Sequence, residues 1–299
     1  MQNILENHQE GAERKQKAML FTGFVLLYVG FYAVMGSGSN GDTSAILSVG
    51  VMQLLILQGI LSGVFFILLP AVFFVYVVKY PIGSLLRPIN IPQFFYVVLI
   101  GISSLIVLSV IVEWNLSIEI PESSFQRWAE AKEAELKTLT EYIIDFKTTG
   151  QFLVALLVVG VFAAVGEELL FRGLLQNLLA KVTGNAHVGI WVAAVIFSAI
   201  HLQFYGFFPR VLLGALFGYL YLWSGNLSIA ILAHFLHNGI SLVIAYVASQ
   251  KLDGLEISPE QMDQSAPWPM IIAFLGLGVF AIIKFIKTSK ENDQVAEGV

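Results

Sequence analysis

Long apolar segments constrain the fold of this chain more than any other feature of its sequence. A helix needs about 20 consecutive apolar residues to cross a bilayer, and only helices and closed barrels satisfy their backbone polar groups in lipid. Eight segments read as such helices: 18–35, 46–79, 94–114, 150–182, 188–204, 207–223, 227–248 and 269–286. We therefore expect an all-α, polytopic integral membrane helical bundle with about eight transmembrane helices.

The composition agrees with a membrane protein and excludes several kinds of function. Of 299 residues, 57% are hydrophobic and only 12% are charged, about half the charged fraction of soluble domains. The net charge of −5 and the lack of a basic patch interleaved with aromatics argue against a nucleic-acid partner, so the lipid bilayer is the expected environment. Because there is no cysteine, catalysis would have to use carboxylates, imidazoles, hydroxyls or amides.

The ends of the apolar segments predict how the chain lies in the membrane. Segment 18–35 follows a polar stretch that ends in Arg14-Lys15-Gln16-Lys17. A cleaved signal peptide is the alternative, but the long apolar run without a clear small-residue cleavage site favours an uncleaved anchor. The Lys and Arg residues beside the segments are consistent with eight crossings and cytoplasmic N- and C-termini. We expect an integral protein of the plasma (inner) membrane of a prokaryote.

Two further segments predict irregular elements. Segment 46–79 is too long for one straight crossing and contains Pro70, which predicts a tilted or kinked helix. The charged connector 115–149 has apolar residues at three- and four-residue spacing after Ser123-Ser124, so we expect an amphipathic helix on the membrane or on the bundle. This helix could serve either as a solvated linker or as a gate for the substrate, and the sequence does not decide between the two. The predicted organisation is 1–149 (about three crossings and this connector), 150–248 (a helical core) and 249–299 (an outer loop, the last crossing and a polar tail).

Three charged residues, Glu167, Glu168 and Arg172, interrupt the apolar segment 150–182. Each costs about 2.5–3.5 kcal/mol at the centre of a spanning helix, so their presence implies mutual pairing or a polar intramembrane cavity. Glu168 and Arg172 are four residues apart, the spacing of a helical ion pair, whereas Glu167 points about 100° away from its neighbour. A purely structural ion pair would leave Glu167 unexplained, so we expect Glu167 to face a cavity.

Two later segments carry polar groups of catalytic type: Phe197 and His201 are four residues apart, and so are His234 and Asn238. Glu167 and His201 each lie roughly 25 Å from the hairpin tip at Gly184-Asn185, at 1.5 Å per residue. We therefore expect the acid and the two histidines to meet in one cavity with Asn238.

These residues form three motifs, Glu167-Glu168-x-x-x-Arg172, Phe197-x-x-x-His201 and His234-x-x-x-Asn238, in order on successive helices. Over about residues 150–248 the chain thereby resembles the CAAX protease and bacteriocin-processing (CPBP, or Abi) family of intramembrane endopeptidases, which includes the type II CAAX prenyl proteases. The resemblance implies an eight-helix fold and cleavage of membrane-associated peptides or proteins near their C-terminal side.

The resemblance also implies roles for the motif residues. Glu167 would act as general base on a water shared with His201, and His234 and Asn238 would stabilise the oxyanion. Glu168, Arg172 and Phe197 would support them. This chemistry suits the residues, because a carboxylate in a poorly solvated cavity is a stronger base than one in water, and an amide donates a hydrogen bond without titrating.

Two alternatives stay open. The first is a zinc protease in which His201, His234 and Glu167 bind the metal; the absence of a His-Glu-x-x-His motif favours a mechanism without metal. The second is a proton-coupled transporter or a non-catalytic immunity or scaffold protein, although no internal repeat is visible. The sequence leaves the substrate open between CAAX-like proteins, leader peptides and other membrane proteins.

Overall fold

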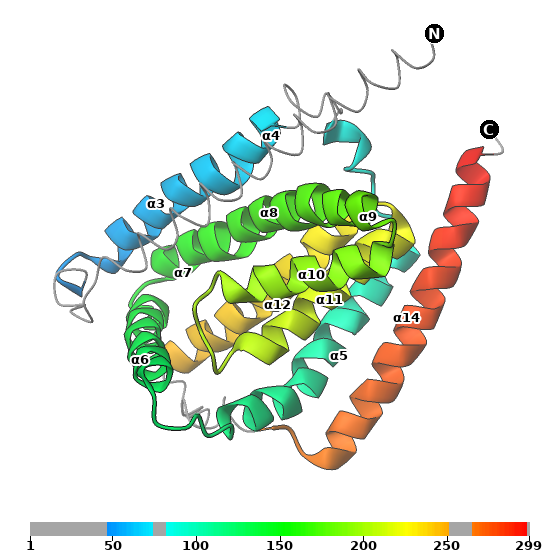
Figure 1. Cartoon of the computed structure of the whole chain (residues 1–299). Coiled ribbons are helices and arrows are strands. Elements are labelled where there is room, and N and C mark those ends of the chain that lie inside the picture. The colour runs from blue at the N-terminus through cyan, green and yellow to red at the C-terminus, as the bar shows by residue number, and fades with distance from the viewer. Residues whose placement is uncertain (1–46, 74–81, 251–264, 298–299) are drawn as a thin grey trace, which may run out of the picture.

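The computed structural model describes residues 47–73, 82–250 and 265–297, with side chains through Glu291, and this part of the chain is helical with short connections and no strand (Figure 1). In chain order the helices are α3 (Val51–Ser62), η1 (Gly63–Leu68), α4 (Leu69–Phe73), η3 (Ile82–Ser84), α5 (Ile91–Leu116), α6 (Ser124–Ile144), α7 (Thr149–Ala155), η4 (Leu156–Phe162), α8 (Ala163–Glu168), η5 (Leu169–Gln176), α9 (Asn177–Thr183), α10 (Ala186–Ala199), α11 (Phe207–Ser224), α12 (Leu227–Ser249) and α14 (Trp268–Glu297). The prediction of an all-α bundle is confirmed.

Six helical runs are long and apolar enough to cross a membrane: Val51–Phe73, Ile91–Leu116, Thr149–Thr183, Phe207–Ser224, Leu227–Ser249 and Trp268–Glu291. They correspond to six of the eight predicted crossings, so the chain is a polytopic integral membrane protein. The predicted crossing 18–35 lies outside the described residues. The orientation of the termini and the three-part division of the chain stay predictions.

The predicted crossing 188–204 is wrong in its length. The helix found there, α10, ends at Ala199 and has 14 residues, fewer than a crossing needs. Shortly after its end, Leu202 has a φ of 56°, in the left-handed region that a right-handed helix cannot continue through. Residues 200–206 therefore form a loop between α10 and α11.

The irregularity predicted at Pro70 takes the form of a π-helical turn, η1, directly before α4. Proline has no N–H to donate, and its ring crowds the carbonyl of the preceding turn, so a wider turn accommodates it. The same turn packs closely against α8: a Cβ built on Gly166 would lie 2.4 Å from the Cβ of Phe66. Only a glycine permits this approach, which places η1 directly beside Glu167.

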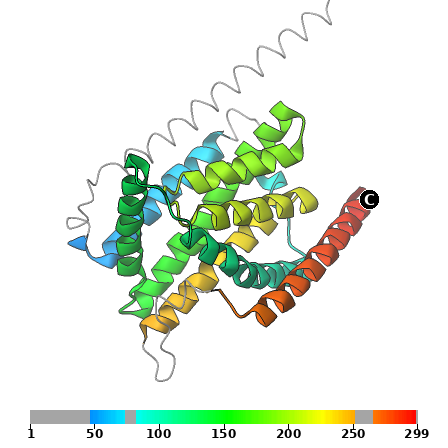
Figure 2. The same ribbon diagram turned by 60° about the horizontal axis from the view of Figure 1, so that its bottom comes forward.

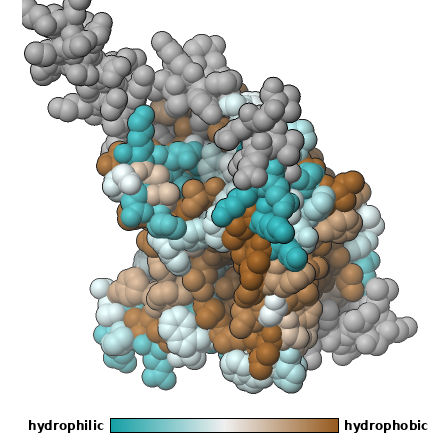
Figure 3. All heavy atoms as spheres, turned by 90° about the vertical axis from the view of Figure 1, so that its right-hand side faces the viewer, coloured by the Kyte–Doolittle hydropathy of each residue, from teal (hydrophilic) through white to brown (hydrophobic). Residues whose placement is uncertain are grey.

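The amphipathic helix predicted in the connector is confirmed as α6, which starts where Ser123 accepts a hydrogen bond from the Gln126 amide. It packs against α3 and α12 and runs across the direction of the spanning helices (Figures 1 and 2). At the opposite side of the bundle α14 packs along α5. On that side hydrophobic residues occupy the middle of the face and hydrophilic residues gather toward its edges, the pattern expected of a lipid-facing surface (Figure 3).

Residues 149–183 form one long helical run that alternates between α-helical and π-helical turns. It begins at a capping box between Thr148 and Gln151 and ends at Gly184, whose φ of 69° needs a glycine. Asn185 then caps α10. The predicted stop at Gly184-Asn185 is thus confirmed, and α9 and α10 form the expected hairpin.

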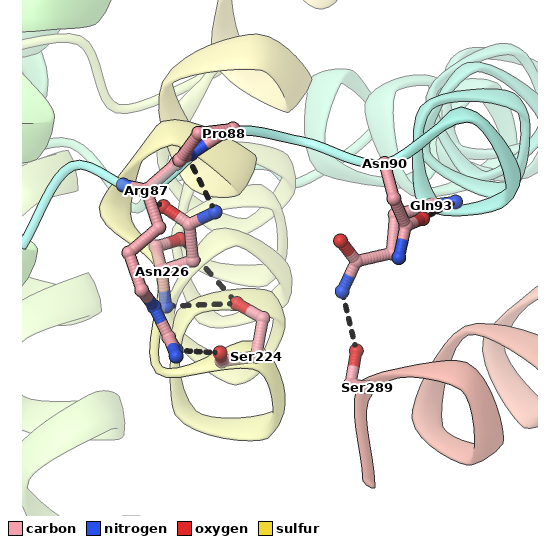
Figure 4. A pocket seen from close by; sticks show the side chains of 7 residues that line it. All are labelled: Arg87, Pro88, Asn90, Gln93, Ser224, Asn226 and Ser289. Atoms are coloured by element: carbon pink, nitrogen blue, oxygen red, sulfur yellow. Dashed lines mark hydrogen bonds between the residues drawn. The ribbon is translucent and has the colours of Figure 1, made fainter. Parts of the chain in front are cut away.

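A polar pocket of about 330 Å³ fixes the start of α12, the helix that carries His234 and Asn238 (Figure 4). In it, Asn226 accepts a hydrogen bond from the Arg87 amide and donates one to the Arg87 carbonyl, both at 3.0 Å. Gln93 donates to the hydroxyl of Ser289 at 3.1 Å, which joins α5 to α14. These bonds hold the α11–α12 turn against the segment before α5, so the depth of α12 in the bundle is set.

Candidate active site

The predicted ion pair between Glu168 and Arg172 is confirmed and lies fully inside the bundle. Arg172 Nη1 is 2.7 Å from Glu168 Oε1, and the two side chains are 1% and 0% exposed. Arg172 Nη2 donates to the carbonyl of Gly214 at 2.7 Å. The guanidinium also lies over the rings of Phe197 and Phe217, 4.9 and 5.5 Å from their centroids. Both terminal nitrogens of Arg172 are therefore satisfied by the protein.

Two glycines on α11 bring backbone carbonyls within reach of polar side chains on η5. A Cβ on Gly214 would lie 3.2 Å from atoms of Ala194 and Phe197, so the backbone of α11 comes unusually close to α10. The close approach brings the Gly214 carbonyl to Arg172, and the Gly218 carbonyl accepts from Gln176 at 3.2 Å. This closely packed face of α11 therefore supplies two hydrogen-bond acceptors to the helix that carries Glu167 and Glu168.

His234 joins the two glutamates of the first motif. Its Nδ1 is 2.8 Å from Glu168 Oε1 and its Nε2 is 3.8 Å from Glu167 Oε2. Its ring stacks on Phe217 with centroids 5.1 Å apart. Because the carboxylate of Glu168 accepts hydrogen bonds, we assign Nδ1 of His234 as the donor. Nε2 then carries a lone pair in the neutral ring and an N–H in the imidazolium, and in both forms it faces Glu167.

Glu167 differs from its neighbour in both exposure and pairing. Its side chain is 15% exposed, against 0% for Glu168. Within the described residues, its one ion-pair contact is the 3.8 Å approach to His234, which is too long for a hydrogen bond. Glu168 is therefore paired inside the bundle, whereas Glu167 is partly exposed; the cavity expected at Glu167 stays a prediction.

His201 lies just beyond the end of α10 rather than on it, which corrects the predicted helical position. Its Nδ1 donates to the carbonyl of Phe197 at 2.8 Å, so Nε2 of the neutral ring is the acceptor. The Phe197 ring contacts the rings of both His201 and His234, at centroid distances of 5.1 and 6.0 Å. In the described part of the chain no hydrogen bond or ion pair joins His201 to Glu167. The two side chains therefore do not interact directly in this way.

Asn238 lies one turn beyond His234 on α12 and contacts the helix that carries Glu167. Its Nδ2 donates to the carbonyl of Val159 at 2.9 Å, within the π-helical turn η4. A π-helical turn shifts backbone hydrogen bonding and is often found at functional sites. The Asn238 amide has a second hydrogen, which this bond leaves available.

Sequence reasoning missed two residues of this neighbourhood. Phe217 supports both Arg172 and His234, but an aromatic residue in an apolar segment gives no signal of such a role. Arg210, in the first turn of α11, donates from Nη2 to Gln203 at 2.7 Å. Its signal was available, because it is a charged residue within an apolar segment, as Arg172 is.

The residues named as zinc ligands in the alternative mechanism do not form a metal site here. No group of three His, Asp or Glu side chains within the described ranges is arranged so that it could hold one metal ion. We derive no step through a metal.

Comparison with known proteins now identifies the segment that carries the site. Residues 149–240 match the family described as "Type II CAAX prenyl endopeptidase Rce1-like". The resemblance is confirmed. Every motif residue, from Glu167 to Asn238, lies within the matched segment. The uncharacterized protein YpbD of Bacillus subtilis (strain 168) is 35% identical over 81 residues, which are 26% of this chain and 38% of that protein. No solved structure matches the chain.

Proposed function

We propose that the protein is an intramembrane endopeptidase that hydrolyses peptide bonds of membrane-associated substrates. The observation that carries the proposal is the contrast between two adjacent acids in an Rce1-like segment. Glu168 is fully buried and paired, whereas Glu167 is accessible and faces Nε2 of His234. A structural ion pair needs no second acid, and an unpaired carboxylate inside a membrane protein is costly unless it has a function.

In the proposed mechanism Glu167 is the general base. It removes a proton from a water molecule whose oxygen attacks the carbonyl carbon of the peptide bond. His201 orients that water through Nε2, because Nδ1 is fixed on the Phe197 carbonyl. The proton then passes from Glu167 to the leaving nitrogen as the C–N bond breaks. This gives a carboxylic acid and an amine, and transfer of the acid's proton to the amine leaves a carboxylate and an ammonium group.

The oxyanion of the tetrahedral intermediate needs donors. His234 would supply one from Nε2 when its ring carries a proton on both nitrogens, with Nδ1 held by the Glu168 carboxylate. The free amide hydrogen of Asn238 is the second donor, and loss of one such donor typically costs about 100- to 1000-fold in rate. Glu168, Arg172 and Phe197 hold these groups in place and take no part in the proton transfers.

The substrate class follows from the location of the site. Glu167, His234 and Asn238 lie on helices long enough to cross the membrane, so the substrate is a membrane-associated peptide or protein that reaches them from the lipid or from the interface. We propose CAAX-like proteins or leader peptides as the substrates, in a prokaryotic plasma membrane with both termini of the enzyme in the cytoplasm.

Mass spectrometry of membrane peptides tests this function. Cells with the wild-type protein should release fragments that are absent with Glu167→Gln and with His201→Ala, all three proteins being present in equal amounts in the membrane. Identical fragments from all three would contradict the proposal. If liposomes with the wild-type protein instead showed a proton flux that Glu167→Gln abolishes, without any proteolysis, the transporter alternative would replace it.

A further inference from the structure

Arg210 is a second arginine near the site; its side chain is partly buried, and the described residues leave one of its terminal nitrogens without a hydrogen bond. Its Nη2 donates to Gln203 Oε1 at 2.7 Å. Its Nη1 is buried and has no hydrogen-bond partner in the described part of the chain. A buried donor without a partner destabilises the protein, and a charged donor does so more than a neutral one. A ligand that accepts from Nη1 would remove this cost.

Arg172 and Arg210 differ in how many of their terminal nitrogens have a hydrogen-bond partner in the described part of the chain. Arg172 donates from one terminal nitrogen to Glu168 and from the other to Gly214, and two aromatic rings cover it. Among the described residues, Arg210 donates a hydrogen bond to the neutral amide oxygen of Gln203. Arg172 is therefore committed to the fold, whereas Arg210 still has binding capacity.

The surroundings of Arg210 place it at the site, on the side of His201. The guanidinium interacts electrostatically with Glu133 of α6 and with Glu167. It also interacts electrostatically with His201, which lies in the same loop as its acceptor Gln203. Arg210 thus belongs to the loop side of the site, beside His201, which suits contact with a part of the substrate beyond the cleaved bond.

The loop between α10 and α11 shapes this place. A Cβ on Gly206 would lie 2.8 Å from Arg210 Nη2, so the loop passes directly against the guanidinium. Phe204 of the same loop meets Phe125 of α6 edge to face, with centroids 5.9 Å apart. The loop therefore lies against Arg210 on one side and contacts α6 on the other; α6 is the helix whose role the sequence left open between a linker and a gate.

We propose that Arg210 binds a carboxylate of the peptide substrate on the His201 side of the site. This rests on the proposed peptidase function and adds to it a substrate class, namely peptides with a carboxylate close to the cleaved bond. The planar guanidinium matches a carboxylate in geometry and charge. The carboxylate is either the C-terminal one or that of an Asp or Glu side chain.

Matched peptide pools test the proposal on the full-length protein in detergent micelles. The probes are quenched fluorescent peptides with an N-terminal acyl anchor and a randomised C-terminal segment, prepared as free acids, as C-terminal amides, and as amides ending in Asp or in Asn. Cleavage by the wild-type protein and binding to the Glu167→Gln variant, followed by fluorescence anisotropy, are measured separately. We expect the carboxylate-bearing pools to be preferred by about 10- to 100-fold, as for a hydrogen bond to a charged group.

Variants assign that preference to Arg210. Arg210→Gln should abolish it and Arg210→Lys should keep part of it, whereas Arg127→Gln, which removes an exposed charge from α6, should leave it unchanged. Preference for the free acid over its amide identifies the C-terminal carboxylate, and preference for Asp over Asn among the amides identifies a side chain.

If the wild-type protein cleaved all pools at equal rates and Glu167→Gln bound them equally, the inference would be overturned. This comparison does not depend on the folding of any Arg210 variant. A preference that survives in Arg210→Gln would overturn it too. Carboxylate-dependent binding without cleavage of any pool would support the Arg210 site and contradict the peptidase function, whereas cleavage without discrimination would do the reverse.

Discussion

Two groups of polar and charged side chains lie near each other in this bundle and differ in how completely the protein satisfies their hydrogen bonds. The paired core consists of Glu168, Arg172 and His234, whose side chains are 5% exposed or less and hydrogen-bonded to one another. The open side consists of Glu167, His201 and Arg210, each of which keeps at least one polar atom without a hydrogen bond to the described residues. Both groups contain an acid, a histidine and an arginine.

The difference shows that residue type alone does not assign a role inside a membrane protein. A buried charge is tolerated when its hydrogen bonds are complete, and then it contributes to the fold. A charge with incomplete hydrogen bonds is kept at a cost and is available to a ligand. On this account, changes to Glu168 and Arg172 reduce stability, and changes on the open side reduce binding or rate. His234 has both roles, because its Nδ1 is bonded in the core and its Nε2 is a proposed oxyanion donor.

The largest expected effect on stability is that of Arg172→Met, which leaves the Glu168 carboxylate buried beside His234 without its cation. Removal of one partner of a buried pair typically costs about 3–5 kcal/mol. Thermal and denaturant unfolding in detergent would measure the loss. Arg127→Met, at an exposed position on α6, should stay within about 0.5 kcal/mol of wild type. A variant as stable as wild type would show that the paired core does not hold the fold.

A smaller effect on stability is expected from Gly166→Ala. Gly166 directly precedes Glu167 of the open side and Glu168 of the paired core, so the substitution tests both groups. The added Cβ would meet Phe66 at 2.4 Å, and its backbone carbon at 3.1 Å, so α8 and η1 must separate. We expect a destabilisation of about 1–3 kcal/mol, as for other overpacked sites, and a loss of cleavage because Glu167 is displaced.

Gly63→Ala is the matched control for that change, because it lies in the same crossing as Phe66 and a Cβ there meets nothing within 4 Å. It should leave both stability and cleavage close to wild type or slightly improved. If Gly166→Ala were as stable and active as Gly63→Ala, the close approach of the two helices would not position Glu167.

The smallest effect is expected from metal removal. Treatment with a strong zinc chelator should leave the rate of cleavage unchanged, because the proposed chemistry uses only side chains and water. The zinc content of the purified protein should be measured in parallel. A loss of activity that zinc alone restores would replace the general base on the open side by a metal centre.

The sequence predicted the paired core well and the open side only in part. The pairing of Glu168 with Arg172 follows from local helical spacing, which survives even though η5 is π-helical. The link from His234 to Glu168 was not foreseen, because it depends on the relative rotation of two helices, which the glycines and Phe217 set by packing. The end of α10 before His201 was also missed, since the apolar segment continues past it and only the backbone turn at Leu202 stops the helix.

Glu167→Gln and Glu168→Gln, compared in one assay, test the central claim most directly. Both replace a carboxylate by an amide of the same size, on adjacent residues of one helix. Glu167→Gln should lower the rate of peptide cleavage by about 100- to 10,000-fold, the usual contribution of a general base, and leave the free energy of unfolding unchanged. Glu168→Gln should lower the free energy of unfolding. A Glu167→Gln protein that cleaves at the wild-type rate, or that is destabilised as much as Glu168→Gln, would contradict the account.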